Sequence, residues 1–92
     1  MRTEAVEIYD DAPNFAVLRH PGRRFPGSLV QGDSLSILAG EAQWLLKRVS
    51  KSKDRALVAA AREHAENLQS RLAHYEKVLG EHNIELPYVK AR

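Results

Sequence analysis

Apolar and polar residues follow two different periods along this chain, an alternating one in the first third and a helical one afterwards. Alternation over residues 4–9, with Val6 and Ile8 on one side, predicts a first β-strand. Residues 15–20 and 28–31 are two further strand candidates, and runs rich in Pro, Gly, Asp and Asn separate the three. Short strands that follow one another so closely predict an antiparallel β-meander.

After the meander, apolar residues recur every three or four positions, which predicts a helix over about residues 34–50. Asp33 or Ser34 is expected to be its N-cap, because both side chains can accept a hydrogen bond from a free amide of the first turn. The apolar stripe that this helix should bury consists of Leu35, Leu38, Ala39, Ala42, Leu45, Leu46 and Val49.

A second, longer helix is predicted over about residues 53–82, with Ser52 as its cap and Asn83 at its end. Its apolar positions step by alternating four and three, as in a heptad seam: Ala61, Ala65, Leu68, Leu72, Tyr75, Leu79 and His82. Pro87 keeps the following segment extended, so the tail should fold back onto the core or add to a sheet edge.

The fold class expected is therefore α+β: a three-stranded antiparallel meander, two antiparallel helices and an extended C-terminal tail. At 92 residues the chain has the length of one small domain, and we expect a single domain over residues 1–92. A domain of this size buries a modest share of its surface, so a partner subunit would stabilise it.

The composition of the chain excludes several classes of functional site and partner. The absence of cysteine excludes disulfides, thiolate nucleophiles and cysteine-ligated metals. The formal net charge is only +2, so nucleic acid is an unlikely partner. An acidic N-terminus without an apolar run predicts no signal peptide, and no stretch could span a membrane. We therefore expect a cytoplasmic protein that does not interact with membranes.

The residues that commonly carry catalysis show no catalytic arrangement. His64, His74 and His82 lie on the second predicted helix at spacings of ten and eight, whereas two metal ligands on one helix need three or four. The sequence contains no nucleophile elbow and no glycine-rich phosphate loop. We expect a protein that is not an enzyme and that has no metal and no cofactor.

Two adjacent arginines, Arg23 and Arg24, lie on a loop stiffened by proline at both ends. Gln31, Asp33 and Ser34 follow at the predicted helix start, where free backbone amides favour anions. If the loop folds over that helix start, the five residues form an anion site. The alternative is a turn shaped by Pro and Gly in which Arg23 or Arg24 pairs with Asp33 or Glu41, and this alternative is the simpler one.

Ile37 and Trp44 are apolar residues of the first predicted helix that do not belong to its core stripe. They are seven positions apart, so they align on the side of the first helix opposite the stripe. Three occupants could cover this side: the C-terminal tail, a second copy of the chain in a homodimer, or a foreign protein. Tryptophan is a common anchor at protein interfaces, so Ile37 and Trp44 are the candidate partner-binding residues.

Two motifs carry a resemblance over nearly the whole chain. The stretch PGRRFPG at 21–27, followed by QGDSL at 31–35, and the C-terminal pattern IxLPY at 84–88 resemble a small uncharacterised family of bacterial domains. The resemblance implies a compact α+β protein and transfers no activity, cofactor or partner.

The function expected first is that of a non-catalytic, protein-binding module, an immunity-type or regulatory protein that binds and inhibits another bacterial protein. The alternative is a small anion- or nucleotide-binding protein that uses the Arg23–Arg24 loop and the helix start. A purely structural homo-oligomer is the third class.

Overall fold

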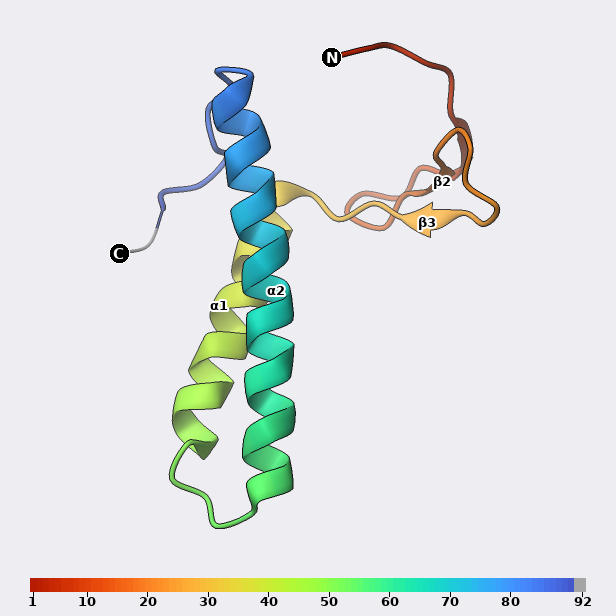
Figure 1. Cartoon of the computed structure of the whole chain (residues 1–92). Coiled ribbons are helices and arrows are strands. Elements are labelled where there is room, and N and C mark those ends of the chain that lie inside the picture. Colours follow the sequence, from red (N-terminus) through yellow and green to blue (C-terminus); the bar gives the residue numbers. More distant parts are fainter. Residues whose placement is uncertain (91–92) are drawn as a thin grey trace. The chain divides into compact units, whose positions relative to one another are not determined.

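The computed structural model describes residues 1–90 and divides the chain into two compact units, one of residues 1–31 and one that begins at Gly32. The first unit holds three strands and the second two helices, which confirms the predicted α+β class (Figure 1). The elements are β1 (Glu7–Asp10), β2 (Val17–Arg19), β3 (Gly27–Ser28), α1 (Gly32–Val49) and α2 (Arg55–Glu81).

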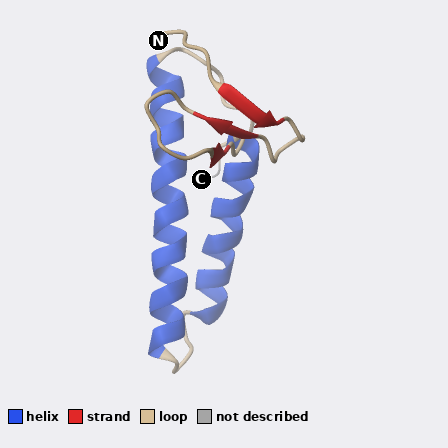
Figure 2. Ribbon diagram, turned by 90° about the vertical axis from the view of Figure 1, so that its right-hand side faces the viewer, coloured by secondary structure: helices blue, strands red, loops and turns tan. Residues whose placement is uncertain are grey.

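The first unit is an antiparallel sheet in the order β1-β2-β3, as a meander requires (Figure 2). Glu7 on β1 lies directly opposite Arg19 on β2, and the two side chains form an ion pair. The hydrogen bond from Arg19, followed by one from Tyr9, lowers the pKa of the Glu7 carboxyl. This cross-strand pair fixes the register of the outer strand on the central one.

The two connections in this sheet are built alike. In each turn a proline is followed by a residue in the left-handed region, Asn14 with φ of 64° after Pro13 and Gly22 with φ of 81° after Pro21. Proline sets the first central position of such a turn, and glycine or asparagine tolerates the second. A backbone hydrogen bond closes each turn, 3.0 Å long in the first and 3.1 Å in the second.

The strands are shorter than the sequence predicts. The third, expected over 28–31, is the pair Gly27–Ser28, and a single backbone hydrogen bond from Leu29 to Ala16 continues the pairing. Within residues 1–31 no residue is fully buried, so the long apolar side chains of this unit stay open to solvent. Small sheets without a buried face have little stability of their own.

In the second unit α1 and α2 run antiparallel, side by side, and a short loop joins them (Figures 1 and 2). On each helix the apolar positions that face the other helix are separated by three and four residues in turn, which is the spacing of a heptad seam. On α1 these are Gly32, Leu35, Ala39, Ala42, Leu46 and Val49. On α2 they are Val58, Ala61, Ala65, Leu68, Leu72, Tyr75 and Leu79. Because the fully buried members are mostly alanine and glycine, the two backbones can approach closely.

The seam confirms the stripe predicted for the second helix up to Leu79, but the predicted stripe of the first helix was too wide. Leu38 and Leu45 are 42% and 48% exposed, so they are not core residues. A single neighbouring helix covers a narrow seam, and these two leucines lie just outside it.

The helix ends differ from the prediction at both N-termini. Helix α1 begins at Gly32, and Asp33 lies inside its first turn, so neither Asp33 nor Ser34 precedes the helix as a cap. The N-cap of α2 is Asp54, whose carboxylate accepts the Leu57 amide at 3.1 Å. Ser52 instead accepts the amide of Asp54, also at 3.1 Å.

The C-terminus of α2 closes where the sequence predicted. Asn83 has φ of 57°, and the amide of Ile84 donates to the Leu79 carbonyl at 2.9 Å. The amide of Asn83 donates to the Gly80 carbonyl at 3.3 Å, which completes a Schellman motif. The chain then turns back along α2 (Figure 1).

Candidate functional site

The outer side of α1 carries an exposed apolar surface. Ile37 and Trp44 are 63% and 58% exposed and lie opposite the seam, where the sequence placed them. Leu38 and Leu45 follow them by one position, with the same spacing of seven, so they lie about 100° around the helix, at the edge of the seam. These four side chains form two parallel rows over two turns of the helix. We call this surface the α1 face.

The sequence predicts Ile37 and Trp44 as surface residues but places Leu38 and Leu45 in the core stripe. The apolar pattern alone does not show how wide a stripe the neighbouring helix covers. The heptad spacing of the α1 seam, from Leu35 through Ala39 to Ala42, is the signal that separates them from the core.

Trp44 is held in place from within its own helix. The guanidinium carbon of Arg48 lies 5.3 Å from the centroid of the indole ring, a cation–π contact between residues one turn apart. Such a contact limits the rotamers of an exposed tryptophan, so less conformational entropy is lost when a partner covers the ring. Glu41 lies between the two pairs of apolar residues along the helix and adds a carboxylate to the face.

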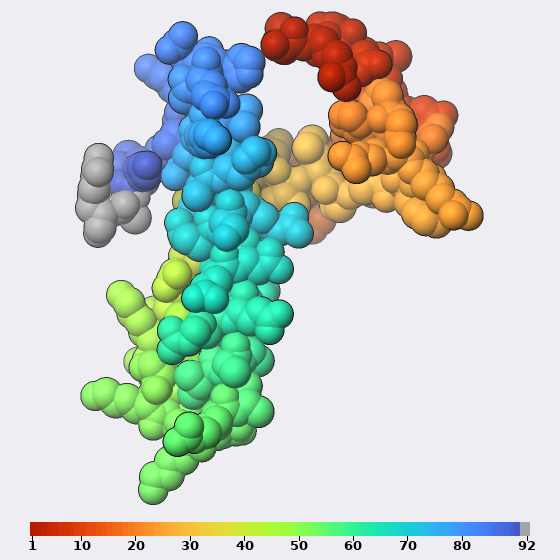
Figure 3. All heavy atoms as spheres, in the orientation of Figure 1, coloured from red at the N-terminus to blue at the C-terminus, as the bar shows by residue number. Residues whose placement is uncertain are grey.

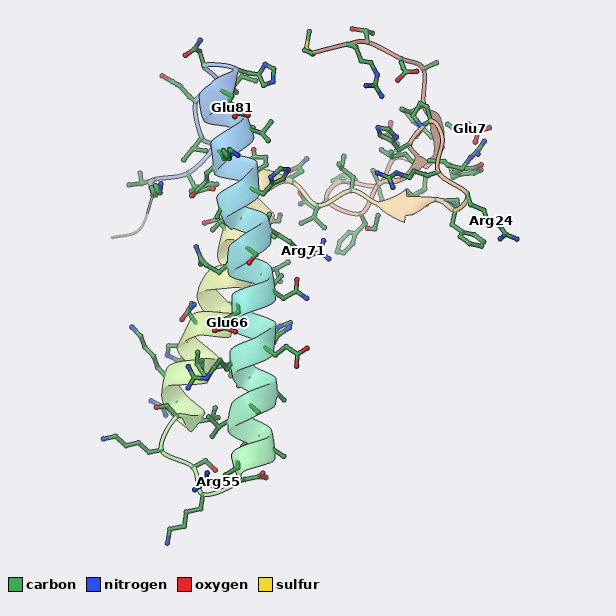
Figure 4. All side chains as sticks on the ribbon, in the orientation of Figure 1. Glu7, Arg24, Arg55, Glu66, Arg71 and Glu81 are labelled. Carbon is green, nitrogen blue, oxygen red and sulfur yellow. The ribbon has the colours of Figure 1, made fainter. Side chains whose placement is uncertain are left out.

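The outer side of α2 has a different character. It is occupied by charged and polar residues, among them Glu66, Arg71 and Glu81, which project from the helix in Figure 4. Arg71 donates to the side-chain oxygen of Asn67 at 3.2 Å, one turn earlier. A largely polar outer surface is the ordinary state of a solvated helix, and Leu57 is the large apolar side chain that α2 exposes.

Within residues 1–90 the C-terminal tail leaves Trp44 exposed. Tyr88 donates its hydroxyl proton to Glu76 on α2 at 2.8 Å, and Lys90 pairs with the same carboxylate at 3.6 Å. Burial, together with this hydrogen bond, raises the pKa of Tyr88 to about 12. Up to Lys90 the tail therefore follows α2, which leaves a second copy or a foreign protein as the occupants to be considered for the side of Ile37 and Trp44.

The arginine loop lies in the first unit, between β2 and β3. Figure 4 shows Arg24 at this loop, and its guanidinium carbon lies 5.3 Å from the centre of the Phe25 ring. Arg23 and Arg24 both line a pocket of about 470 Å³. Within residues 1–31 neither arginine belongs to an ion pair.

The other residues of the predicted anion site lie further along the chain. Gln31 is exposed in the segment that links β3 to α1, and Asp33 and Ser34 belong to the first turn of α1. The carboxylate of Asp33 accepts the amide of Ser34 at 2.8 Å. One of the free amides at this helix start therefore already has an anionic partner, so the start of α1 is less suited to a second anion.

A second group of cations surrounds the loop between the helices. Figure 3 shows extended side chains protruding at this end of the helical pair. Lys53, Arg55 and Arg62 line an open pocket of about 590 Å³ there, and Figure 4 labels Arg55. No aromatic residue lines it, and lysines and arginines of this kind commonly keep a turn solvated.

The histidines and carboxylates of the described chain are dispersed. Within residues 1–90 no three or more His, Asp or Glu side chains are grouped so that they could hold a metal ion. Neither α1 nor α2 combines the length and the apolar composition of a membrane-crossing helix.

Comparison with known proteins places the chain in a family. No curated protein and no solved structure matches it. A family model matches residues 1–88, in agreement with the expected membership of an uncharacterised family, although it does not test the two signature motifs. The chain therefore belongs to DUF6959, a family of unknown function.

Proposed function

We propose that this chain is a non-catalytic protein-binding module, a bacterial regulatory or immunity-type protein that binds and inhibits a partner protein. The observation that carries the proposal is the exposed α1 face of Ile37, Leu38, Trp44 and Leu45. Large apolar side chains that are grouped on the surface of a protein often mark interaction sites. The proposed location is the cytoplasm.

The arrangement of the face suits recognition by a groove or by another helix. Ile37 and Trp44 lie two turns apart on one side of α1, which is the i, i+7 spacing of anchors by which helices bind apolar grooves. Trp44 is the largest of the four and has the restrained ring described above, so it is the expected hot spot. Glu41 and Arg48 provide polar contacts around the apolar centre.

The partner is either a foreign protein or a second copy of the chain. The charges at the two ends of α1 allow the second copy: Asp33 lies in its first turn, and Lys47 and Arg48 lie in its last turn. Two copies of α1 packed antiparallel through their outer faces would place opposite charges together. An inhibitory module, in contrast, would use the face on a different protein.

The test is the combined variant Ile37→Ser and Trp44→Ala, compared with Leu57→Ala. Leu57 is an exposed apolar residue of α2 outside the face, so its loss controls for general loss of apolar surface. Light scattering reports self-association, and purification from the native host reports a foreign partner. We expect the double variant to lose the complex and Leu57→Ala to keep it. A double variant that keeps both assembly and phenotype would refute the proposal.

A further inference from the structure

The pocket of the first unit combines apolar walls with cations at its rim. It lies between the end of β2 and the β2–β3 loop, and its volume of about 470 Å³ is in the range that holds small organic ligands. Leu18, Phe25 and Leu29 provide the apolar lining, while His20, Arg23 and Arg24 provide the basic groups.

The two arginines at this pocket have no ion-pair partner within their own unit. Within residues 1–31 neither Arg23 nor Arg24 has a carboxylate within ion-pairing distance, whereas Arg19 of the same unit is paired with Glu7. Glu7 also accepts the hydroxyl of Tyr9 at 3.0 Å, so this carboxylate is already engaged. Two adjacent guanidinium groups without a partner attract an anion, and each can bind it bidentately.

The loop that presents the arginines is held by local contacts. The backbone amide of Arg23 donates to the His20 carbonyl at 3.1 Å, across the Pro21–Gly22 turn. Arg19 donates from its guanidinium to the carbonyl of Arg23 at 3.2 Å. The contact of Arg24 with the Phe25 ring places a cation beside an apolar surface. A loop fixed in this way loses little entropy on binding.

We propose that this pocket binds a small organic anion: a carboxylate, sulfonate or phosphate that carries an aromatic ring or an acyl chain. The anionic group pairs with Arg23 and Arg24, and the apolar body lies against Leu18, Phe25 and Leu29. A simple inorganic anion would leave the apolar lining in water, and a neutral ligand would leave the arginines without a partner. The proposal goes beyond protein binding by the α1 face, and it needs no contribution from Asp33 or Ser34.

Anilinonaphthalene sulfonate, an aromatic sulfonate, is a direct probe for the full-length chain, with binding followed by calorimetry and by amide NMR shifts. The variant Arg23→Gln with Arg24→Gln should weaken binding by about tenfold or more. Arg55→Gln with Arg62→Gln, which removes two charges from the pocket at the helical loop, should leave the affinity unchanged. The NMR shifts should cluster in residues 18–29.

Two further ligands, inorganic phosphate and anionic lipid vesicles, distinguish specific binding of an organic anion from unspecific attraction between charges. Inorganic phosphate should bind more weakly than the aromatic sulfonate, and Phe25→Ala should reduce this difference even if the arginine variant does not fold. Equal weakening by both arginine pairs would overturn the proposal, because it would show unspecific charge attraction. Shifts centred on Ile37 and Trp44, or binding to anionic lipid vesicles without binding of the free probe, would overturn it as well.

Discussion

Gly32, the first residue of α1, lies directly against the phenol ring of Tyr75 on α2. A methyl group at Gly32 would overlap the ring atoms of Tyr75, so a side chain at this position requires the ring to move. Gly32 is buried and Tyr75 is half-buried, and both are seam positions. The close approach of the two helices at this end of the pair therefore depends on the absence of a side chain at residue 32.

Gly32→Ala should destabilise the second unit by about 1–3 kcal/mol, the usual cost of forcing extra volume into a packed contact. Gly40→Ala is the matched control, because a Cβ there meets open space in the exposed interior of the same helix. That control should raise stability by about 0.5–1 kcal/mol through helix propensity. Urea denaturation measures both, and a Gly32→Ala variant as stable as Gly40→Ala would contradict the packing described.

Adding Tyr75→Leu to Gly32→Ala makes the test more specific. The smaller side chain removes the overlap, so the two substitutions should cost less together than the sum of their separate effects. Strict additivity would show that the cost of Gly32→Ala does not arise from Tyr75.

Replacement of the α2 cap should weaken the start of that helix. Asp54→Ala removes the acceptor of the Leu57 amide, and loss of an N-cap costs about 0.5–2 kcal/mol. Asp54→Ser and Asp54→Asn keep an acceptor and should recover most of this stability. Thermal denaturation followed by circular dichroism gives the ranking. An alanine variant equal to the serine variant would contradict the assignment of Asp54 as the cap.

The stability of the α2 C-terminus should respond differently to two small replacements of Asn83. Because its φ is 57°, Asn83→Gly relieves a left-handed residue and should leave stability unchanged or raise it. Asn83→Ala should lower stability by about 1 kcal/mol, since alanine tolerates this region less well than asparagine. Hydrogen exchange of the Ile84 amide, which donates to Leu79, reports the local effect. Equal exchange in the two variants would contradict the Schellman closure.

The C-terminal tail should detach from α2 as the pH becomes strongly alkaline. The pKa of Tyr88 is raised from 10.0 to about 12 by burial and by its hydrogen bond to Glu76. The folded protein therefore holds this proton more tightly than the unfolded chain. The stabilisation by Tyr88 is complete below about pH 10 and is lost as the pH rises through about 12. Above that, a phenolate would face the Glu76 carboxylate.

A tyrosinate absorbance titration, together with the amide shifts of residues 84–89, measures this dependence. The late titration step should disappear in Tyr88→Phe. In Glu76→Gln, Tyr88 should titrate at a lower pH, because the repelling carboxylate is gone. Titration of Tyr88 near its ordinary value in the unchanged protein would show that the tail is not attached through this hydrogen bond.

Much of the fold could be predicted because its signals are local. The Pro–Asn and Pro–Gly turns, the heptad spacing of α2 and the left-handed Asn83 all act through neighbouring residues, and the observed elements follow them. The start of α1 could not be predicted in this way. Gly32 is a poor helix former, and the reason for its place is Tyr75, which lies 43 residues further along the chain.

The candidate site was only partly predictable for a related reason. Ile37 and Trp44 stand opposite any plausible stripe, so the helical period alone identified them. Leu38 and Leu45 lie at the margin of the stripe. Whether they are buried depends on how much of α1 the neighbouring helix covers, and in the structure they are exposed. The pocket at Arg23 and Arg24 depends on how the β2–β3 loop folds beside Leu18 and Leu29, which no spacing in the sequence shows.

The central claim, that the α1 face binds a protein, is tested most directly by photocrosslinking in the native host. A photoreactive phenylalanine analogue replaces Trp44 in one variant and Glu63, an exposed residue of α2, in the control. We expect a discrete adduct from position 44, with the mass of a dimer or of a complex with another protein, and none from position 63. No adduct from position 44, or the same adducts from both positions, would contradict the claim.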